Sequence, residues 1–164
     1  MKTIVQLGLL GMFAAMLPVA VQAQTLPVMA PSPWEFTTKN EAIIITKYTG
    51  PGGAVIIPGT LNGQPVVRIE DKAFWACTNV TSVTVPAGVT SVGDYAFGMC
   101  SSLKGVYFTS AAPSFGSSVF FKDENLTVYY LPGTSGWAQL CGDRPTARWI
   151  REDQRDAAGG KPSQ

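Results

Sequence analysis

The chain of 164 residues contains no histidine, and charged residues make up only 14% of it. Histidine is the commonest general base near neutral pH and the commonest metal ligand, so its absence argues against many enzyme classes and metal sites. The formal net charge is +1, and lysine and arginine form no run that could supply the basic surface that nucleic acid requires. We therefore expect one ordered domain with no cofactor, no metal ion and no nucleic-acid partner.

Charge is also nearly absent from the first 23 positions. The stretch from Ile4 to Val21 is apolar apart from Gln6, follows a positive start at Lys2, and leads to the small residue Ala23. This pattern is typical of a secretory signal peptide that is cleaved after Ala23. An uncleaved N-terminal anchor is the alternative, because the stretch approaches the ~18 to 20 apolar residues that cross a bilayer. In both cases we expect an exported domain that is secreted, periplasmic or at the surface of a bacterial cell, and that meets a membrane only through this segment, if at all.

Composition divides the rest of the chain into three parts. Residues 24–33 carry three prolines and are predicted to form an extended lead-in. Residues 34–150 have the composition of a single folded domain. Residues 151–164 mix charged residues with glycine and proline and lack apolar residues to pack, which predicts a mobile tail.

A repeat of about 23 residues runs through the folded part of the chain. Phe74 is in step with Phe97 and Phe120, and several other positions recur at the same interval. The further recurring sets are Val80, Leu103 and Leu126; Ile69, Val92 and Phe115; Val83 and Val106; Ala73 and Ala96; and Cys77 and Cys100. A period of this length predicts a solenoid, in which each coil buries its apolar side chains against its neighbours.

Each coil is predicted to contain one strand, one turn and one short helical turn. Val83 to Val85 read as a strand that ends at Pro86. Each coil would have its own short helix, which begins three residues before the recurring phenylalanine. The residue at that position is Asp71, Asp94 or Ser117 in the three coils, and all three are good N-cap residues. The sequence thus predicts an α/β repeat solenoid with a parallel sheet on one side and short helical turns opposite it.

Both ends of such a stack need covering, because terminal coils expose apolar side chains and unpaired strand edges. Residues 34–38 and 42–47 are β-prone runs on either side of 39–41, which predicts an N-terminal β-hairpin cap. Residues 131–150 are predicted to form the C-terminal cap.

The repeat has the pattern Val80-x-x-Val83-x-Val85-Pro86-x-x-Val89-x-x-Val92-Gly93-x-x-Ala96-Phe97-x-x-Cys100-x-x-Leu103. This pattern resembles the BspA-like, bacterial-surface subclass of leucine-rich repeats over roughly residues 55–131, and residues 129–146 resemble the closing segment of its short secreted members. The third coil departs from it, with Thr109 in place of the proline and Asp123 in place of the cysteine. The resemblance implies a curved, right-handed solenoid with its sheet on the concave face, export, a role in adhesion or recognition, and no catalytic residues.

The outward face of the predicted sheet is the candidate binding surface. With Val83 and Val85 inward, strand alternation points Thr84 outward. The period then places Tyr107 and Tyr130 beside Thr84, and Ile56 extends this row on the other side. Adjacent exposed tyrosines offer a rigid contact area to the apolar or sugar face of a partner. The alternative is that these aromatic side chains only pack against one another on a half-exposed sheet.

Three cysteines in an exported chain leave the thiol chemistry open. Cys77 and Cys100 share one repeat position, so stacked coils would place them about 5 Å apart, within the range of a disulfide. The alternative is that this position requires a small buried side chain, which a free cysteine supplies well. Cys141 lies outside the repeats and has no evident partner.

Recurring acidic residues have a functional interpretation and a structural one. Asp71 and Asp94, one coil apart, could approach the ~5 to 5.5 Å separation of a retaining glycosidase pair. Together with Asp123 or Glu124 they could instead bind calcium. The N-cap interpretation accounts for both aspartates and also for Ser117, and no loop concentrates oxygen ligands at a recognisable spacing.

Two further features are explained by the repeat. Asn79-Val80-Thr81 and Asn125-Leu126-Thr127 match the N-glycosylation pattern, but their middle residues are core positions at turn-to-strand junctions. Trp75, which follows buried Phe74, is predicted to lie on the outer side of the solenoid, where it is exposed or shields the edge of a coil.

The sequence therefore predicts an exported, non-enzymatic domain that recognises a protein or glycan at or outside the cell surface. A second hypothesis is a structural envelope component that associates with itself through an uncovered end of the solenoid. A glycoside hydrolase is a third, for which the sequence offers no histidine, nucleophile elbow or metal cluster.

Overall fold

In the computed structural model, residues 32–142 and 144–150 are described. The predicted signal peptide at 1–23, most of the predicted lead-in and the predicted tail at 151–164 lie outside these ranges. No helix long and apolar enough to cross a membrane occurs in the described ranges.

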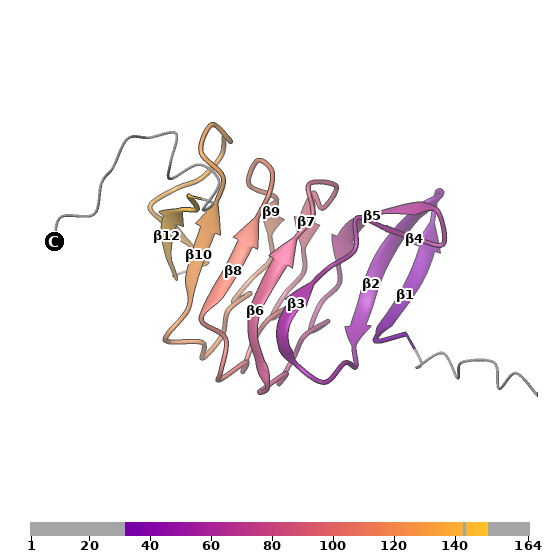
Figure 1. The fold of residues 1–164 in the computed structure, drawn as a ribbon, viewed down its shortest axis with the longest axis horizontal. Helices are drawn as coiled ribbons and strands as arrows, with labels where there is room; N and C mark the ends of the chain where they lie inside the picture. The colour runs from indigo at the N-terminus through magenta and orange to yellow at the C-terminus, as the bar shows by residue number, and fades with distance from the viewer. Residues whose placement is uncertain (1–31, 143, 151–164) are drawn as a thin grey trace, which may run out of the picture. The chain divides into compact units, whose positions relative to one another are not determined.

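The chain winds between two sheets, each of six strands (Figure 1). The first, which we call the long-strand sheet, has the order β11-β12-β10-β8-β6-β3, formed by Leu140–Cys141, Arg144–Arg148, Thr127–Tyr130, Gly105–Phe108, Val80–Val85 and Gly53–Ile56. The second has the order β1-β2-β5-β7-β9, formed by Trp34–Lys39, Ala42–Tyr48, Gln64–Ile69, Ser91–Val92 and Ser114–Phe115, and β4 (Thr60–Leu61) pairs with β5.

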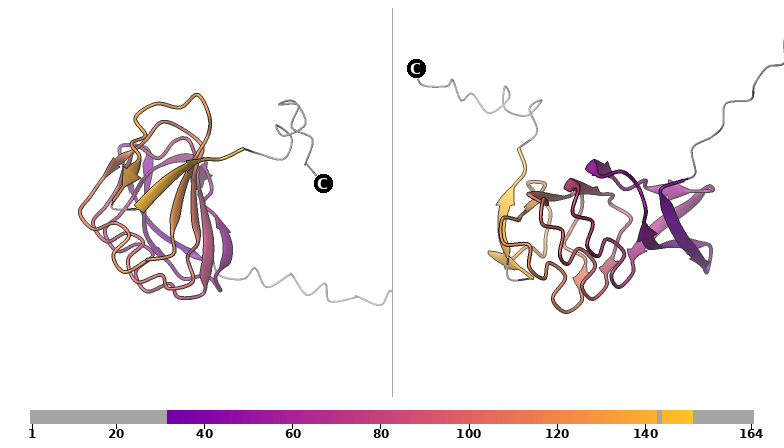
Figure 2. Two further views of the ribbon diagram at one scale, coloured as in Figure 1. Left: turned by 90° about the vertical axis from the view of Figure 1, so that its left-hand side faces the viewer. Right: turned by 90° about the horizontal axis from the view of Figure 1, so that it is seen from below.

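Successive coils pair in parallel, which confirms the predicted parallel-strand solenoid. The strands β3, β6, β8 and β10 follow one another in the long-strand sheet, and β5, β7 and β9 do the same in the second sheet. Viewed along the stack, the coils overlie one another (Figure 2, left). At the N-terminal end, β1 and β2 form an antiparallel hairpin, and β2 continues the second sheet by pairing in parallel with β5.

The core is a set of ladders in which equivalent side chains of successive coils lie on one another. Phe74, Phe97 and Phe120 are at most 1% exposed, and their rings stack with centroids 4.9 and 5.7 Å apart. Tyr48 of β2 adds a further ring, 5.2 Å from Phe74. Full burial of such a side chain stabilises a fold by roughly 1.5–3 kcal/mol, so this ladder is a principal source of cohesion between coils.

The predicted short helical turns are not observed: the described residues contain no helix, and turns occupy these segments. Non-glycine residues with positive φ interrupt each turn, and they are Lys72, Ala76, Tyr95, Met99, Ser118 and Lys122. An α-helix requires consecutive negative φ values, so it cannot form here. Instead, alternate backbone N–H groups donate to carbonyls of the next coil, as Phe74 does to Ala96 and Phe97 does to Val119.

The predicted helix caps also have a different role. The Asp71 carboxylate accepts a hydrogen bond from the Asp94 N–H at 2.9 Å, and the Asp94 carboxylate accepts one from the Ser117 N–H at 2.6 Å. Each aspartate therefore holds the start of the next turn rather than the start of its own. The residues just before the two N–H donors are Gly93 and Gly116, and a Cβ at either position would collide with the aspartate of the preceding coil.

Candidate functional site

One row of residues crosses the outward face of the long-strand sheet. Ile56 lies beside Thr84, and Thr84 lies beside Tyr107, as the sequence predicted. Tyr107 then lies beside Tyr129, and Tyr129 beside Ala147 of β12. Ile56 is 73% exposed and forms the open end of the row at the sheet edge.

Tyr130 was wrongly predicted to belong to this row. The third coil has one residue fewer between Leu126 and Val128 than the second has between Leu103 and Val106, so the strand register is shifted by one. Because side chains alternate between the faces of a strand, this shift brings Tyr129 outward in place of Tyr130.

Tyr130 occupies an inward register position instead. It pairs with buried Phe108, and its ring stacks on the indole of Trp137 at 5.2 Å, with the planes 9° apart. Trp137 in turn contacts the rings of Phe108 and Phe115 and donates its indole N–H to the Ser110 carbonyl. Tyr130 thus belongs to the aromatic packing at the C-terminal end of the core.

Three aromatic side chains gather where the outward row crosses β8, β10 and the end of β12. The rings of Tyr107 and Tyr129 are stacked, 4.8 Å apart and 9° from parallel. Trp149 lies 5.0 Å from Tyr107, with its plane tilted by 59°. We call these three residues the sheet aromatic cluster. The sequence placed Trp149 in a last extended piece, but no repeat spacing indicated its contact with Tyr107.

The backbone holds the cluster in position. The Trp149 N–H donates to the Tyr130 carbonyl at 2.7 Å, which continues the pairing of β12 with β10. The Tyr107 ring lies over Gly105, where a Cβ would stand 2.8 Å from the ring. Burial, and then the neighbouring Tyr129, raises the pKa of Tyr107, so this hydroxyl is neutral at physiological pH and available as a hydrogen-bond donor.

The cysteines are free thiols, so the Cys77–Cys100 disulfide is not formed. Cys100 is 1% exposed and donates its S–H to the Phe74 carbonyl at 3.0 Å. Burial, followed by the nearby Asp123 and Cys77, raises the pKa of Cys100 to about 12. Burial also raises the pKa of Cys141 to about 11 and that of Cys77 by less. These thiols therefore stay protonated and poorly nucleophilic at neutral pH.

Asp123 occupies the ladder position of the two cysteines and is buried beside the C-terminal strands. It is 2% exposed, and neither of its carboxylate oxygens has a hydrogen-bond partner in the described part of the chain. Burial raises its pKa to about 6, and the Cys100 backbone and the Arg144 guanidinium oppose that rise. No group of three or more acidic or cysteine side chains that could hold a metal ion occurs among the described residues, so Asp123 does not form part of a calcium cluster there.

The acidic pair proposed for glycosidase chemistry is used structurally. Both Asp71 and Asp94 accept backbone hydrogen bonds across coils, and Asp71 also lies 3.5 Å from the Arg68 guanidinium. A carboxylate engaged in this way is poorly suited to act as nucleophile or general acid. The geometry therefore favours the structural interpretation of the pair.

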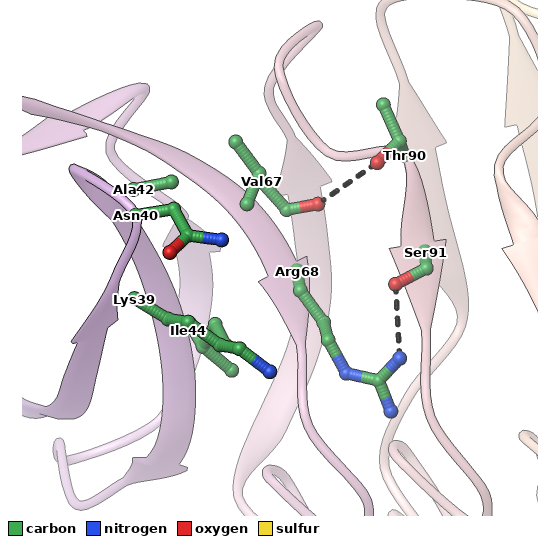
Figure 3. Close-up of a pocket in the computed structure, with 8 residues that line it drawn as sticks. All are labelled: Lys39, Asn40, Ala42, Ile44, Val67, Arg68, Thr90 and Ser91. Carbon is green, nitrogen blue, oxygen red and sulfur yellow. Dashed lines mark hydrogen bonds between the residues drawn. The ribbon is translucent and has the colours of Figure 1, made fainter.

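A groove of about 290 Å³ lies on the second sheet, along β2, β5 and the start of β7 (Figure 3). Its lining residues are Lys39, Asn40, Ala42, Ile44, Val67, Arg68, Thr90 and Ser91. Arg68 donates to Ser91 and Glu70, both at 3.2 Å, and forms ion pairs with Glu70 and Asp71. These contacts engage the guanidinium, whereas Lys39 has no ion pair within the described residues.

The fold and its surface define a class of protein: a solenoid of parallel coils with an aromatic cluster on the outward face of the long-strand sheet. Residues 60–136 match the family model for the BspA type leucine rich repeat region, in six copies. This match confirms the BspA-like repeat pattern that the sequence predicted for the coils.

The chain is also similar to solved structures. A leucine rich cell surface protein from Faecalibacterium prausnitzii A2-165 is 33% identical, with a match that covers 60% of this chain and a TM-score of 0.53. The match spans only 29% of that protein's length. A leucine-rich repeat protein from Bacteroides capillosus ATCC 29799 is 24% identical, with a TM-score of 0.49. The match covers 72% of this chain and 95% of the Bacteroides chain. None of the curated proteins compared with this chain matches it.

Proposed function

We propose that this chain is a short, exported, non-enzymatic recognition domain, and that the outward face of the long-strand sheet binds a protein or glycan at or outside the cell surface. The observation that carries the proposal is the sheet aromatic cluster of Tyr107, Tyr129 and Trp149. Tyr107 and Tyr129 lie on the paired strands β8 and β10, and Trp149 directly follows β12, where its backbone N–H donates to the Tyr130 carbonyl. Ring surface fixed in this way is presented to a partner at little cost in conformational entropy.

The neighbouring outward positions strengthen this proposal. A second row beside the cluster contains only small side chains, namely Ala54, Ser82, Gly105 and Thr127. The Tyr107 ring covers Gly105 of this row, so a partner meets ring surface there rather than a recess. Tyrosine and tryptophan are enriched among the few positions that carry most of the binding energy in an interface.

Export is supported by two independent features. The first 23 residues have the composition of a signal peptide, and the 33% identical Faecalibacterium protein is described as a cell surface protein. The absence of histidine, the protonated thiols and the structural use of Asp71 and Asp94 all favour a binding role over a catalytic one.

Proximity cross-linking of the full chain on intact producing cells tests the proposal. We expect the wild-type chain to capture a partner, and the double variant Tyr107→Ala/Tyr129→Ala to lose most of that capture. Met99→Ala is the control, because it removes an exposed apolar side chain from the turn side of the solenoid, outside the cluster. Equal capture by the wild type and the sheet variant, with both chains folded, would disprove the role of the cluster.

Self-association remains a second candidate, favoured by the β3 edge of the long-strand sheet. This strand ends the sheet order, and it carries Ile56, the exposed first residue of the outward row. An open edge of this kind can accept a strand from another molecule. Light scattering that shows only monomers at high concentration would exclude this candidate.

A further inference from the structure

The turn side of the solenoid carries a second group of aromatic side chains, separate from the sheet. Trp75 and Phe121 follow buried Phe74 and Phe120 and are 37% and 39% exposed. Tyr95 lies between them from the intervening turn and is half-buried. We call Trp75, Tyr95 and Phe121 the turn-side aromatic patch. It spans three successive coils, so it runs along the axis of the stack.

The three rings are ordered relative to one another. Trp75 and Phe121 are 9° from parallel, with centroids 6.4 Å apart. Tyr95 meets both edge-on at 80°, at 5.9 Å from Trp75 and 5.8 Å from Phe121. Such offset and edge-to-face pairs are the favoured arrangements of aromatic rings, so the patch is held in one geometry by its own contacts.

Gly98 makes this geometry possible. It occupies the repeat position of Trp75 and Phe121 in the middle coil, and a Cβ there would lie 2.8 Å from the Trp75 ring and 3.4 Å from Phe121 Cβ. The indole therefore covers glycine backbone rather than an apolar side chain.

Two lysines accompany the rings. The Lys72 Nζ lies 5.8 Å from the Trp75 ring centroid, and the Lys122 Nζ lies 5.4 Å from that of Phe121. Neither lysine forms an ion pair within the described residues, where both ion pairs belong to Arg68. Beside Lys72, the Asp71 carboxylate accepts a backbone hydrogen bond and faces Arg68. Beside Lys122, neither buried Asp123 nor exposed Glu124 forms an ion pair with it. Both lysines therefore lack an ion-pair partner in the described part of the chain.

We propose that the turn-side aromatic patch binds an acidic polysaccharide laid along the solenoid axis. The apolar C–H faces of sugar rings would stack on Trp75 and Phe121, and uronate carboxylates would pair with Lys72 and Lys122. The Trp75 and Phe121 ring centroids lie 6.4 Å apart although they come from coils at either end of the patch, so one polymer laid along the axis can contact both rings. Exposed ion pairs contribute little each, so a single contact is weak and a polymer gains through multivalency.

Affinity electrophoresis of the full chain through gels that contain polygalacturonate, alginate or hyaluronan tests this proposal. We expect retardation by at least one polymer, and loss of retardation when fully methyl-esterified polygalacturonate replaces the free acid. Lys72→Gln/Lys122→Gln should weaken binding by at least about tenfold, and Trp75→Ala by a similar factor. Lys39→Gln/Lys104→Gln is the matched control and should bind as the wild type does.

The lysine variants keep the experiment decisive, because neither side chain belongs to the core and their replacement leaves the fold intact. Binding to none of the three polymers would overturn the proposal, as would equal binding of the methyl ester or unchanged binding by the lysine variant. Tighter binding to phosphatidylglycerol vesicles, or dimers that Trp75→Ala dissociates, would also overturn it, in favour of a membrane or a second copy of the chain. Tyr107→Ala/Tyr129→Ala should leave polymer binding unchanged, which separates this site from the sheet aromatic cluster.

Discussion

The long-strand sheet and the turn side join the same coils by different means. In the sheet, β3, β6, β8 and β10 pair through parallel ladders, with a register shift between Gly53 and Ala54 in the first pair and a coil shortened by one residue before β10. On the turn side, turns that contain residues of positive φ are joined by backbone hydrogen bonds and by aspartate carboxylates that accept from the next coil. The difference shows that a repeat can keep its side chains in phase on one side while its register changes on the other.

The surfaces of the two sides differ in the same way. In the turn-side aromatic patch, Trp75 and Phe121 occupy one repeat position, whose residue in the middle coil is Gly98. Tyr95 lies three residues before that glycine. The sheet aromatic cluster depends on two irregular features, the shortened third coil and Trp149 from outside the repeats. Coil packing alone does not account for residues at irregular positions. We therefore assign the main recognition role to the sheet.

The largest effect is expected where the turn side enters the core. Phe97→Ala removes a ring that is 0% exposed and stacked between Phe74 and Phe120, so we expect a loss of ~3–5 kcal/mol in the free energy of unfolding. Urea denaturation measures this. Met99→Ala, at a 39% exposed position of the same turn, should change stability by less than about 1 kcal/mol. Similar losses in the two variants would mean that the turn side does not hold the stack together through its phenylalanine ladder.

The next largest effect concerns Asp123, the position at which the turn-side ladder changes from cysteine to carboxylate. Its pKa rises to about 6 from an ordinary value of 3.8, so the folded chain binds a proton more tightly than the unfolded chain does. The resulting stability is fully present below pH 3.8 and is lost as the pH rises through about 6. We expect this group to make unfolding easier at pH 7 than at pH 4 by roughly 2–3 kcal/mol.

Asp123→Asn isolates that effect from the titration of other carboxylates. The pH dependence of unfolding between pH 4 and 7 should become flatter in this variant, whereas Glu124→Gln, at the exposed neighbouring position, should leave it unchanged. An identical pH profile for Asp123→Asn and the wild type would contradict the shifted pKa.

A smaller effect tests the carboxylate ladder itself. Asp94→Ala removes the acceptor of the Ser117 N–H, and loss of a comparable cap costs about 1 kcal/mol. Asp94→Asn retains a side-chain oxygen and should recover most of that loss. Chemical denaturation of the two variants compares them directly, and equal destabilisation would indicate that the charge, rather than the hydrogen bond between coils, matters.

The recurring apolar positions were sufficient to predict the solenoid and most of its core. Phe74, Phe97 and Phe120 form a stacked ladder because a residue that recurs in phase must lie above its equivalent in the next coil. The hairpin at 34–48 also follows from its two β-prone runs. These features depend on local pattern and period, which the sequence displays.

Other features depend on contacts between coils and could not be predicted from pattern alone. N-cap preference concerns neighbours in sequence, so it predicts that Asp94 caps its own turn. In the structure, the Asp94 carboxylate instead accepts a hydrogen bond from Ser117, 23 residues away. Tyr130 was placed outward because the period of 23 was extended through Leu126, and the missing residue that follows brings Tyr129 outward instead. Trp149 lies outside the repeats, so only the pairing of β12 with β10 shows that it reaches Tyr107.

Site-specific photocross-linking from two adjacent positions tests the central claim most directly. A photoreactive phenylalanine analogue is placed at position 129 or at position 130 of the full chain, and capture on intact cells is compared. The outward register of Tyr129 and the inward register of Tyr130 predict capture of a partner from position 129 and little or none from position 130. No capture from position 129, or equal capture from both positions, would contradict the assignment of the outward face of the long-strand sheet as the recognition surface.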